Sequence, residues 1–237
     1  MQKLFVLLRQ GNIEEVKRII EMKPQLLNSI SGPNPKKDRG QSLLQVALKS
    51  GHFDIAEYLI DKGIDVDFME EEDDDPGIRV PVLFDAIMAS IDSLCINQFA
   101  SQDVIKERFR GSDMALKLLS RIISSGADVN KRSSNGMSAM NWALHHAEQI
   151  MRNPEAYPFS QEKVREQLTR ILDLLIDHGT DLKAWRNEGT YPEPSPGTSA
   201  QLLYFAEEDP HSGINYDAVR EMRNYIRSYF RNRRLLQ

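Results

Sequence analysis

The sequence predicts an all-α fold built from repeated helix pairs, and three observations lead to this prediction. One phrase recurs, as YLIDKGIDVD at 58–67, RIISSGADVN at 121–130 and LLIDHGTDLK at 174–183. Each phrase ends an apolar helical stretch with a glycine, which adopts the left-handed conformation after a helix at the least steric cost. A shorter helical stretch lies upstream of each phrase.

The shorter upstream stretches lie at 38–52, 80–90 and 135–147 and share a second pattern. Each has an apolar residue three positions before an alanine. A small residue at that position allows neighbouring helix pairs to approach closely, so we expect the alanines to be buried between pairs. The three pairs are Leu44 and Ala47, Leu83 and Ala86, and Met140 and Ala143.

These patterns resemble the ankyrin repeat family, whose unit of about 33 residues combines two helices with a β-turn. The best match covers 38–68, at Gly40, Ser42, Leu44, Ala47, Gly51, His52, Ile55, Leu59, Gly63, Asp65 and Val66. The resemblance implies an ankyrin-type α-solenoid of stacked helix–loop–helix units with β-turn fingers. It implies a single domain over residues 1–237, with about five divergent units at 1–30, 38–68, 79–130, 133–183 and 188–237.

The chain departs from the family pattern in one tetrapeptide and in its spacing. The family's Thr-Pro-Leu-His reads Ser-Leu-Leu-Gln at 42–45, and the histidine position holds Gln45, Phe84 and Asn141 in three successive units. Gly63 and Gly126 are 63 residues apart, which indicates insertions rather than a hidden repeat.

We place the insertions at 69–79, 91–112 and 148–167. The first is an acidic run that we expect to be solvated. In the second, the first helix is expected to continue into 91–100, and Ser101 is expected to cap a new helix. In the third, Ser160 is the expected cap, and the lengthened helices of neighbouring units should form one wall. A further proline-rich stretch, 187–200, reads as a loop.

Composition limits the classes of function. The chain has 30 Lys and Arg against 35 Asp and Glu, a formal charge of −5, which argues against broad binding to a phosphate backbone. Cys95 is the single cysteine, so neither an internal disulfide nor a cysteine-pair metal site can form. Since no stretch is long and apolar enough for a membrane span, we expect a cytoplasmic monomer without membrane contact.

Residues suited to catalysis are sparse, and the sequence predicts no enzyme, no cofactor and no metal. His52 and His178 stand at structural positions next to helix ends. His145 and His146 are adjacent, so they point in different directions and do not form a metal-binding pair. Cys95 is expected to be buried as a small hydrophobic residue in the lengthened helix.

Two alternatives remain open at this point. One is an enzyme with a site in the insertions. The other is a nucleic-acid-binding protein that uses the C-terminal helix, where arginines alternate with aromatic residues. The same helical spacing also fits an amphipathic cap at the end of the array. The residues concerned are Arg223, Tyr225, Arg227, Tyr229, Phe230, Arg231, Arg233 and Arg234.

The resemblance also implies a binding surface, because ankyrin arrays recognise other proteins through the concave face and the finger tips. We therefore predict non-enzymatic protein recognition, in the form of an inhibitor or immunity-type protein for a basic toxin or enzyme. An acidic finger suits such a basic partner. The predicted partner-binding residues are Arg39, Gln41, Lys49, Glu70, Glu71, Glu72, Asp73, Asp74, Asp75, Ile78, Val80, Met88, Asn135, Met137, His145 and His146.

Overall fold

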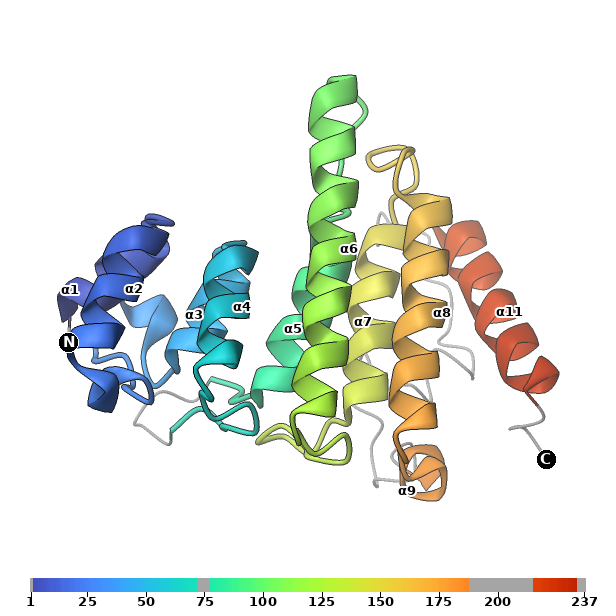
Figure 1. Ribbon diagram of the computed structural model, residues 1–237. Helices are drawn as coiled ribbons and strands as arrows, with labels where there is room; N and C mark the ends of the chain where they lie inside the picture. The colour runs from blue at the N-terminus through green and yellow to red at the C-terminus, as the bar shows by residue number, and fades with distance from the viewer. Residues whose placement is uncertain (1, 72–76, 188–214, 234–237) are drawn as a thin grey trace.

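A computed structural model describes residues 2–71, 77–187 and 215–233. These residues form helices and two isolated antiparallel β-bridges, which agrees with the predicted all-α class. Figure 1 shows the helices following one another across the molecule in chain order, from the N-terminus to α11. Helices α2, α4, α6 and α8 face the viewer, and α5 and α7 lie behind them.

The helices come in antiparallel pairs joined by short or lengthened loops. The pairs are α1 (Gln2–Arg9) with α2 (Ile13–Met22), α3 (Leu43–Lys49) with α4 (Phe53–Asp61), α5 (Val82–Asp92) with α6 (Gln102–Ser124), and α7 (Ala139–Met151) with α8 (Gln161–Asp177). A short helix, α9 (Leu182–Asn187), follows, and α11 (Tyr216–Asn232) lies beyond the stretch 188–214. Two 3-10 turns, η1 (Pro24–Leu26) and η2 (Lys36–Asp38), lie in the loop before α3.

The second helix of three pairs ends in the same way. Gly63, Gly126 and Gly179 have φ of +81°, +108° and +92°, the left-handed region predicted for them. After α4, the N–H of Gly63 donates to the carbonyl of Ile60 and the N–H of Ile64 donates to that of Leu59. This pair of bonds satisfies carbonyls that the helix leaves unpaired. The recurring glycine therefore ends each helix and turns the chain towards the next unit.

The polar residues of the recurring phrase connect successive units. The side chain of Asn28 accepts a hydrogen bond from the N–H of Asp65 at 3.1 Å. Asp67 accepts from Asp128 at 3.0 Å, and Asn130 accepts from Asp181 at 2.7 Å. Each unit thus ends in a side-chain acceptor for a backbone donor of the next unit, and this ladder explains why the phrase is repeated.

Small residues lie between neighbouring helix pairs, as predicted. Ala47, Ala86 and Ala143 are all buried, in α3, α5 and α7. Helix α3 contacts α5, and α5 contacts α7. In the same way, α4 contacts α6, and α6 contacts α8. The core is consequently one continuous cluster that runs along the row of helices.

Three loops connect the pairs along the lower edge of Figure 1, and we call them fingers. The first spans 30–42, the second 69–81 and the third 133–137. Within the first two, antiparallel bridges join Ile30 to Ser42 and Met69 to Pro81. Between fingers, the N–H of Glu71 donates to the carbonyl of Gly40 at 3.2 Å. The N–H of Ser134 donates to the carbonyl of Arg79 at 2.9 Å. Backbone hydrogen bonds therefore hold the fingers in one row.

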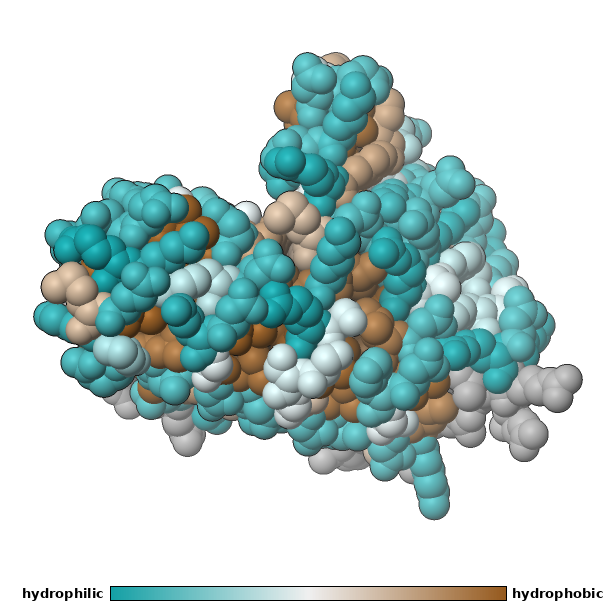
Figure 2. Space-filling model, in the orientation of Figure 1, coloured by the Kyte–Doolittle hydropathy of each residue, from teal (hydrophilic) through white to brown (hydrophobic). Residues whose placement is uncertain are grey.

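The second insertion differs from the prediction. Helix α5 stops at Asp92 instead of continuing through 91–100, because Leu94 and Ile96 turn inward and are buried. Cys95 lies between them in the turn and is exposed, so its predicted burial is wrong. Ser101 caps α6 as predicted, accepting from the N–H of Val104. Figure 2 shows the first half of α6 standing clear of the surrounding surface.

The third insertion also differs in detail. Helix α7 extends to Met151, four residues beyond the predicted end at 147. Ser160 stands at the start of α8, but its hydroxyl does not cap that helix. It donates instead to the carbonyl of Leu94, in the turn after α5. The two insertions are therefore joined by a buried hydrogen bond, and α6 contacts α8 along the wall that they form.

Candidate functional site

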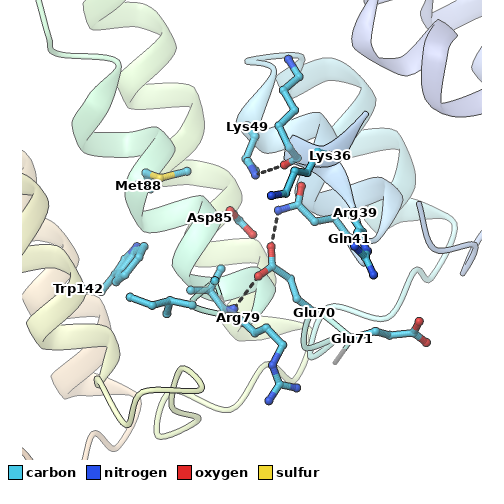
Figure 3. A pocket seen from close by; sticks show the side chains of 14 residues that line it. Lys36, Arg39, Gln41, Lys49, Glu70, Glu71, Arg79, Asp85, Met88 and Trp142 are labelled. Atoms are coloured by element: carbon cyan, nitrogen blue, oxygen red, sulfur yellow. Dashed lines mark hydrogen bonds between the residues drawn. The ribbon is translucent and has the colours of Figure 1, made fainter. Parts of the chain in front are cut away.

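A groove lies between the first two fingers and the first helices of two units. Its volume is about 340 Å³. The first finger and α3 form one side, the second finger closes the end, and α5 with α7 forms the other side (Figure 3). Fourteen residues line it: Lys36, Lys37, Arg39, Gln41, Lys49, Glu70, Glu71, Gly77, Ile78, Arg79, Val80, Asp85, Met88 and Trp142.

Three polar side chains converge at the floor of the groove. Gln41, Glu70 and Asp85 point towards one another in Figure 3, from the first finger, the second finger and α5 respectively. One oxygen of Glu70 accepts from the amide nitrogen of Gln41, and the other accepts from the N–H of Val80 at 2.9 Å. We call these three residues the floor.

Asp85 is the most buried of the three, with an exposed fraction of 2%. Its Oδ2 accepts from Gln45 Nε2 at 2.8 Å. Burial, followed by the charge of Glu70, raises the pKa of Asp85 to about 8, while Lys49 and the bond from Gln45 oppose the shift. Loss of hydration penalises the charged form of a carboxyl, so Asp85 is protonated in a large part of the molecules at neutral pH.

Gln45 stands where the ankyrin pattern has histidine, and it joins two units. Its side chain forms a capping box with Ser42 at the start of α3. The same side chain donates to the carbonyl of Val80 at 3.1 Å and to Asp85. In the next unit the indole N–H of Trp142 donates to the carbonyl of Phe84 at 3.1 Å. A side chain at or next to the histidine position therefore joins neighbouring units in both places, but it is Gln45 in one and Trp142 in the other.

Apolar surface forms the other walls of the groove. Met88 of α5 is half-buried, and Trp142 of α7 packs on Phe84 with ring centroids 5.4 Å apart. Ile78, on the second finger, is exposed. An entering group would meet carboxyls at the floor, aliphatic and aromatic surface on one side, and cations around the rim.

Several predicted partner-binding residues lie at this groove, though not all are accessible. Lys49 and Glu71 are exposed, and Arg39, Glu70 and Met88 are half-buried. Gln41 and Val80 are buried, and they line the groove from within. Both turn inward because each finger folds back on itself through backbone bonds, from Ser31 N–H to Gln41 O at 2.8 Å in the first finger and from Glu70 N–H to Val80 O at 3.3 Å in the second.

The acidic run is less uniform than predicted. Glu70 does not project into solvent, because one of its oxygens accepts from Gln41 of the first finger and the other accepts from Val80 of its own finger. Glu71 is exposed and points away from the floor in Figure 3. Glu72, Asp73, Asp74 and Asp75 lie outside the described residues.

The remaining predicted residues lie towards the next unit. Asn135 is exposed and Met137 half-buried on the third finger. His145 and His146 do not end α7, which continues to Met151. His146 is half-buried, its Nδ1 lies 2.9 Å from Asp92 Oδ1, and its ring packs on Trp142. His146 therefore forms part of the contact between α5 and α7, and the half-buried ring of His145 lies against it with ring centroids 5.6 Å apart.

Asp85 and Trp142 line the groove, yet the sequence patterns did not single them out. A carboxyl within the apolar stretch VLFDAI is the signal that could have identified Asp85, because an unpaired buried carboxyl is costly. Trp142 follows the histidine position of its unit, where the aligned residue of the previous unit is Asp85 itself. The two residues thus occupy equivalent positions in successive units.

The remaining candidates for chemistry take structural places. His52 Nε2 lies 3.0 Å from the carbonyl of Arg9, and His178 Nδ1 lies 2.8 Å from that of Leu174. Although Cys95 as a residue is exposed, the loss of hydration around its thiol and the nearby Asp92 raise the pKa of the thiol to about 11, which opposes a role as a nucleophile. Among residues 2–71, 77–187 and 215–233, no group of three or more His, Cys, Asp or Glu could hold a metal ion.

The C-terminal helix directs its aromatic residues into the fold. Ile226 and Phe230 are buried, and the hydroxyl of Tyr229 donates to Asp173 of α8 at 2.7 Å. Arg233 pairs with Asp173 and Asp177. This arrangement fits a cap on the row of helices and leaves these aromatic faces unavailable for stacking on bases.

Comparison with known proteins supports ankyrin-repeat character. The family model described as ankyrin repeat matches residues 39–68, which include α3, α4 and the end of the first finger. A search of curated proteins finds no match. Ankyrin repeats bind other proteins and are typically non-enzymatic. No helix in the described part of the chain is long and apolar enough to cross a membrane.

Proposed function

We propose that the protein recognises another protein, without catalysis, through the groove and the adjoining fingers. In this proposal the chain is one domain, an ankyrin solenoid of about five units, and it acts as a monomer in the cytoplasm. The groove is the observation that supports it most directly. It brings together elements of three successive helix pairs, α3, α5 and α7, with the first two fingers.

The composition of the groove suits a contact with a protein surface. Half-buried Met88 and the ring of Trp142 offer apolar area, and polar and charged groups surround them. Clusters of this kind, in which a buried apolar centre has a polar rim, contribute most of the free energy of binding in protein interfaces. A volume of about 340 Å³ accommodates one or two side chains, so the fingers would supply the rest of the contact.

The partner class that we propose is a basic toxin or enzyme, which the protein would inhibit or neutralise. Two features support a basic partner. The run 70–75 consists of six acidic residues, and two carboxyls, those of Glu70 and Asp85, lie at the floor of the groove. Opposite charges on the two proteins would accelerate their association.

The test begins with capture of the partner on the immobilised protein and its identification by mass spectrometry. Binding of the purified partner is then compared between Met88→Ala and Met22→Ala. Met88 lies in the groove, whereas Met22 is exposed at the end of α2. We expect Met88→Ala to accelerate dissociation by at least about tenfold, because truncation of a hot-spot residue at an interface centre costs about 2 kcal/mol or more. Met22→Ala should bind like the unmodified protein.

A second variant tests the charge. Neutralising residues 71–75 to Gln and Asn leaves Glu70 in place, since Glu70 holds the finger through the N–H of Val80. Association should become slower and less dependent on salt, while dissociation changes little. If Met88→Ala and the neutralised variant both bind as tightly as the unmodified protein, the groove is not the site. The wall of α6 and α8 would then be the next surface to test.

A further inference from the structure

The floor of the groove contains hydrogen-bond acceptors that the protein does not use. Gln41 has an exposed fraction of only 4%, and its buried side-chain oxygen has no hydrogen-bond partner. Asp85 receives one hydrogen bond, from the neutral amide of Gln45, and forms no ion pair in the described part of the chain. Both oxygens of Glu70 accept from neutral donors.

Two charged neighbours, Glu70 and Lys49, act on Asp85. Glu70 acts on Asp85 by repulsion, and Lys49 is the cation whose charge opposes it. The ammonium of Lys49, however, donates to the carbonyl of Lys37 at 3.1 Å, away from the floor. The other charged groups of the lining come from the fingers: Lys36, Lys37, Arg39, Glu71 and Arg79. From α7, the side chain that lines the groove is Trp142, which is uncharged.

We propose that this floor receives one basic side chain, a lysine or an arginine, of the partner protein. The inference rests on the proposed function and names the group that the groove would take. The cationic head would donate to Gln41 Oε1 and to the carboxyls of Asp85 and Glu70. Its aliphatic stem would lie along Met88 and Trp142, and the aromatic face of Trp142 adds an attraction for a cation.

An acidic side chain suits the floor less well. It would bring a third carboxyl beside Glu70 and Asp85, and it would offer no donor to the unpaired oxygen of Gln41. The cations of the rim do not reverse this preference. Lys36, Arg39 and Arg79 already have interactions of their own, and Lys49 is bonded to Lys37. The floor therefore contains oxygens that can still accept hydrogen bonds from a donor.

Binding of a cation at this floor would be coupled to release of a proton. A positive charge beside Asp85 favours its ionised form, so the pKa of Asp85 falls on binding. The complex therefore loses up to one proton at neutral pH. By linkage, affinity for a basic side chain should rise with pH up to about 8, the pKa of Asp85 in the absence of the ligand, and level off above it. An acidic ligand would produce the opposite trend.

The experiment uses short capped peptides as probes: Gly-Gly-Xaa-Gly-Gly with arginine, lysine, citrulline or glutamate at the centre. Citrulline has the shape of arginine without its charge. Binding is followed by nuclear magnetic resonance through the indole N–H of Trp142, assigned with Trp142→Phe, at pH 6 and pH 8.5. We expect saturable shifts with the arginine or lysine peptide, tighter at the higher pH, and at least tenfold weaker binding of citrulline and glutamate.

Variants of the floor complete the test. Asp85→Asn should weaken binding of the basic peptides at least tenfold and abolish its pH dependence. Glu14→Gln changes an exposed carboxyl on α2 and serves as the control. Gln41→Leu provides a second floor variant if Asp85→Asn does not fold. The proposal is overturned if no basic peptide gives a saturable shift, if arginine and citrulline bind alike, or if the glutamate peptide binds more tightly.

The captured partner separates this inference from the proposed function. If Met88→Ala weakens its binding while Asp85→Asn and Gln41→Leu do not, the groove recognises the partner without a basic side chain at the floor. The inference then fails and the proposed function stands. If none of the three variants weakens binding, both are rejected.

Discussion

The unit at 38–68 and the unit at 79–130 contain the same connecting elements and differ in what they add. Both place a small residue between helix pairs, Ala47 and Ala86, and both end in a glycine with positive φ. Yet α3 and α4 have 7 and 9 residues, whereas α5 and α6 have 11 and 23. The shared residues set how units stack, and the added ones create the projecting half of α6 (Figure 2).

The two units also differ in a polar residue that is buried in the first helix of each, Gln45 in α3 and Asp85 in α5. Gln45 of α3 is neutral, and its amide is fully used by Ser42, Val80 and Asp85. Asp85 of α5 is a carboxyl with one hydrogen bond and a second carboxyl, Glu70, nearby. A neutral, satisfied group stabilises the fold, whereas an unpaired buried carboxyl opposes it. The second unit retains a group that costs stability, and that group lies at the groove.

The largest expected effect comes from replacing Asp85 with asparagine. The pKa of Asp85 is raised to about 8 in the folded protein, above its ordinary value near 4. The folded state then binds more protons than the unfolded state between about pH 4 and pH 8, so this carboxyl lowers stability as pH rises through that window. Asp85→Asn keeps an acceptor for Gln45 and removes the charge. Its free energy of unfolding should exceed that of the unmodified protein increasingly from pH 5 to pH 8.

Because one proton is involved, the free energies of unfolding of Asp85→Asn and the unmodified protein should diverge by at most about 1.4 kcal/mol per pH unit. Urea unfolding at several pH values, followed by circular dichroism, measures it. Asp54→Asn, an exposed carboxyl at the start of α4, is the matched control and should not change the slope. A variant that follows the pH dependence of the unmodified protein would mean that Asp85 is well hydrated or paired in solution.

The next largest effect concerns the residues that the two units share. Ala47→Leu, Ala86→Leu and Ala143→Leu should each lower the free energy of unfolding by roughly 1–3 kcal/mol, because added methylene groups do not fit between packed helices. Ala184→Leu on the partly exposed helix α9 should change it far less. If Ala86→Leu is tolerated while Ala47→Leu is not, the longer unit is the more loosely stacked of the two.

These comparisons also indicate what the sequence could predict. The glycine-terminated ends of α4, α6 and α8, the buried alanines and the fingers follow from local patterns, because glycine after a helix and small residues at contacts have the same physical role in every unit. The turn at 93–100 did not follow, since Leu94 and Ile96 fit a continued helix equally well. Burial of Gln41 and Val80 depends on how the finger folds back on α3 and α5, which no local pattern records.

A smaller effect is expected from breaking the ladder between the two units. Asp67 accepts a hydrogen bond from the N–H of Asp128 and pairs with Lys131 at 2.8 Å. Asp67→Ala leaves that backbone donor without its partner and should cost about 1 kcal/mol, as loss of a helix cap does. Asp67→Asn retains the acceptor and should cost less. Asp61→Ala removes only an exposed ion pair with Arg121 and should be nearly neutral. Equal losses for Asp67→Ala and Asp61→Ala would show that the ladder contributes no more than a surface pair.

The smallest effect should come from exposed Val104 on the projecting half of α6, which has no counterpart in the shorter unit. Phe99 is 87% exposed before this helix, and Val104 is 48% exposed on its first turn, whereas the next residue, Ile105, is only 6% exposed. Val104→Thr and Ile105→Thr therefore make a matched pair on one turn. We expect Ile105→Thr to lower the free energy of unfolding by roughly 1–2 kcal/mol and Val104→Thr to stay within about 0.5 kcal/mol, since exposed positions far from packed contacts are tolerant. Urea unfolding at two protein concentrations measures both. A large, concentration-dependent loss for Val104→Thr would mean that another copy of the chain covers this half of α6 in solution, which would contradict the proposed monomer.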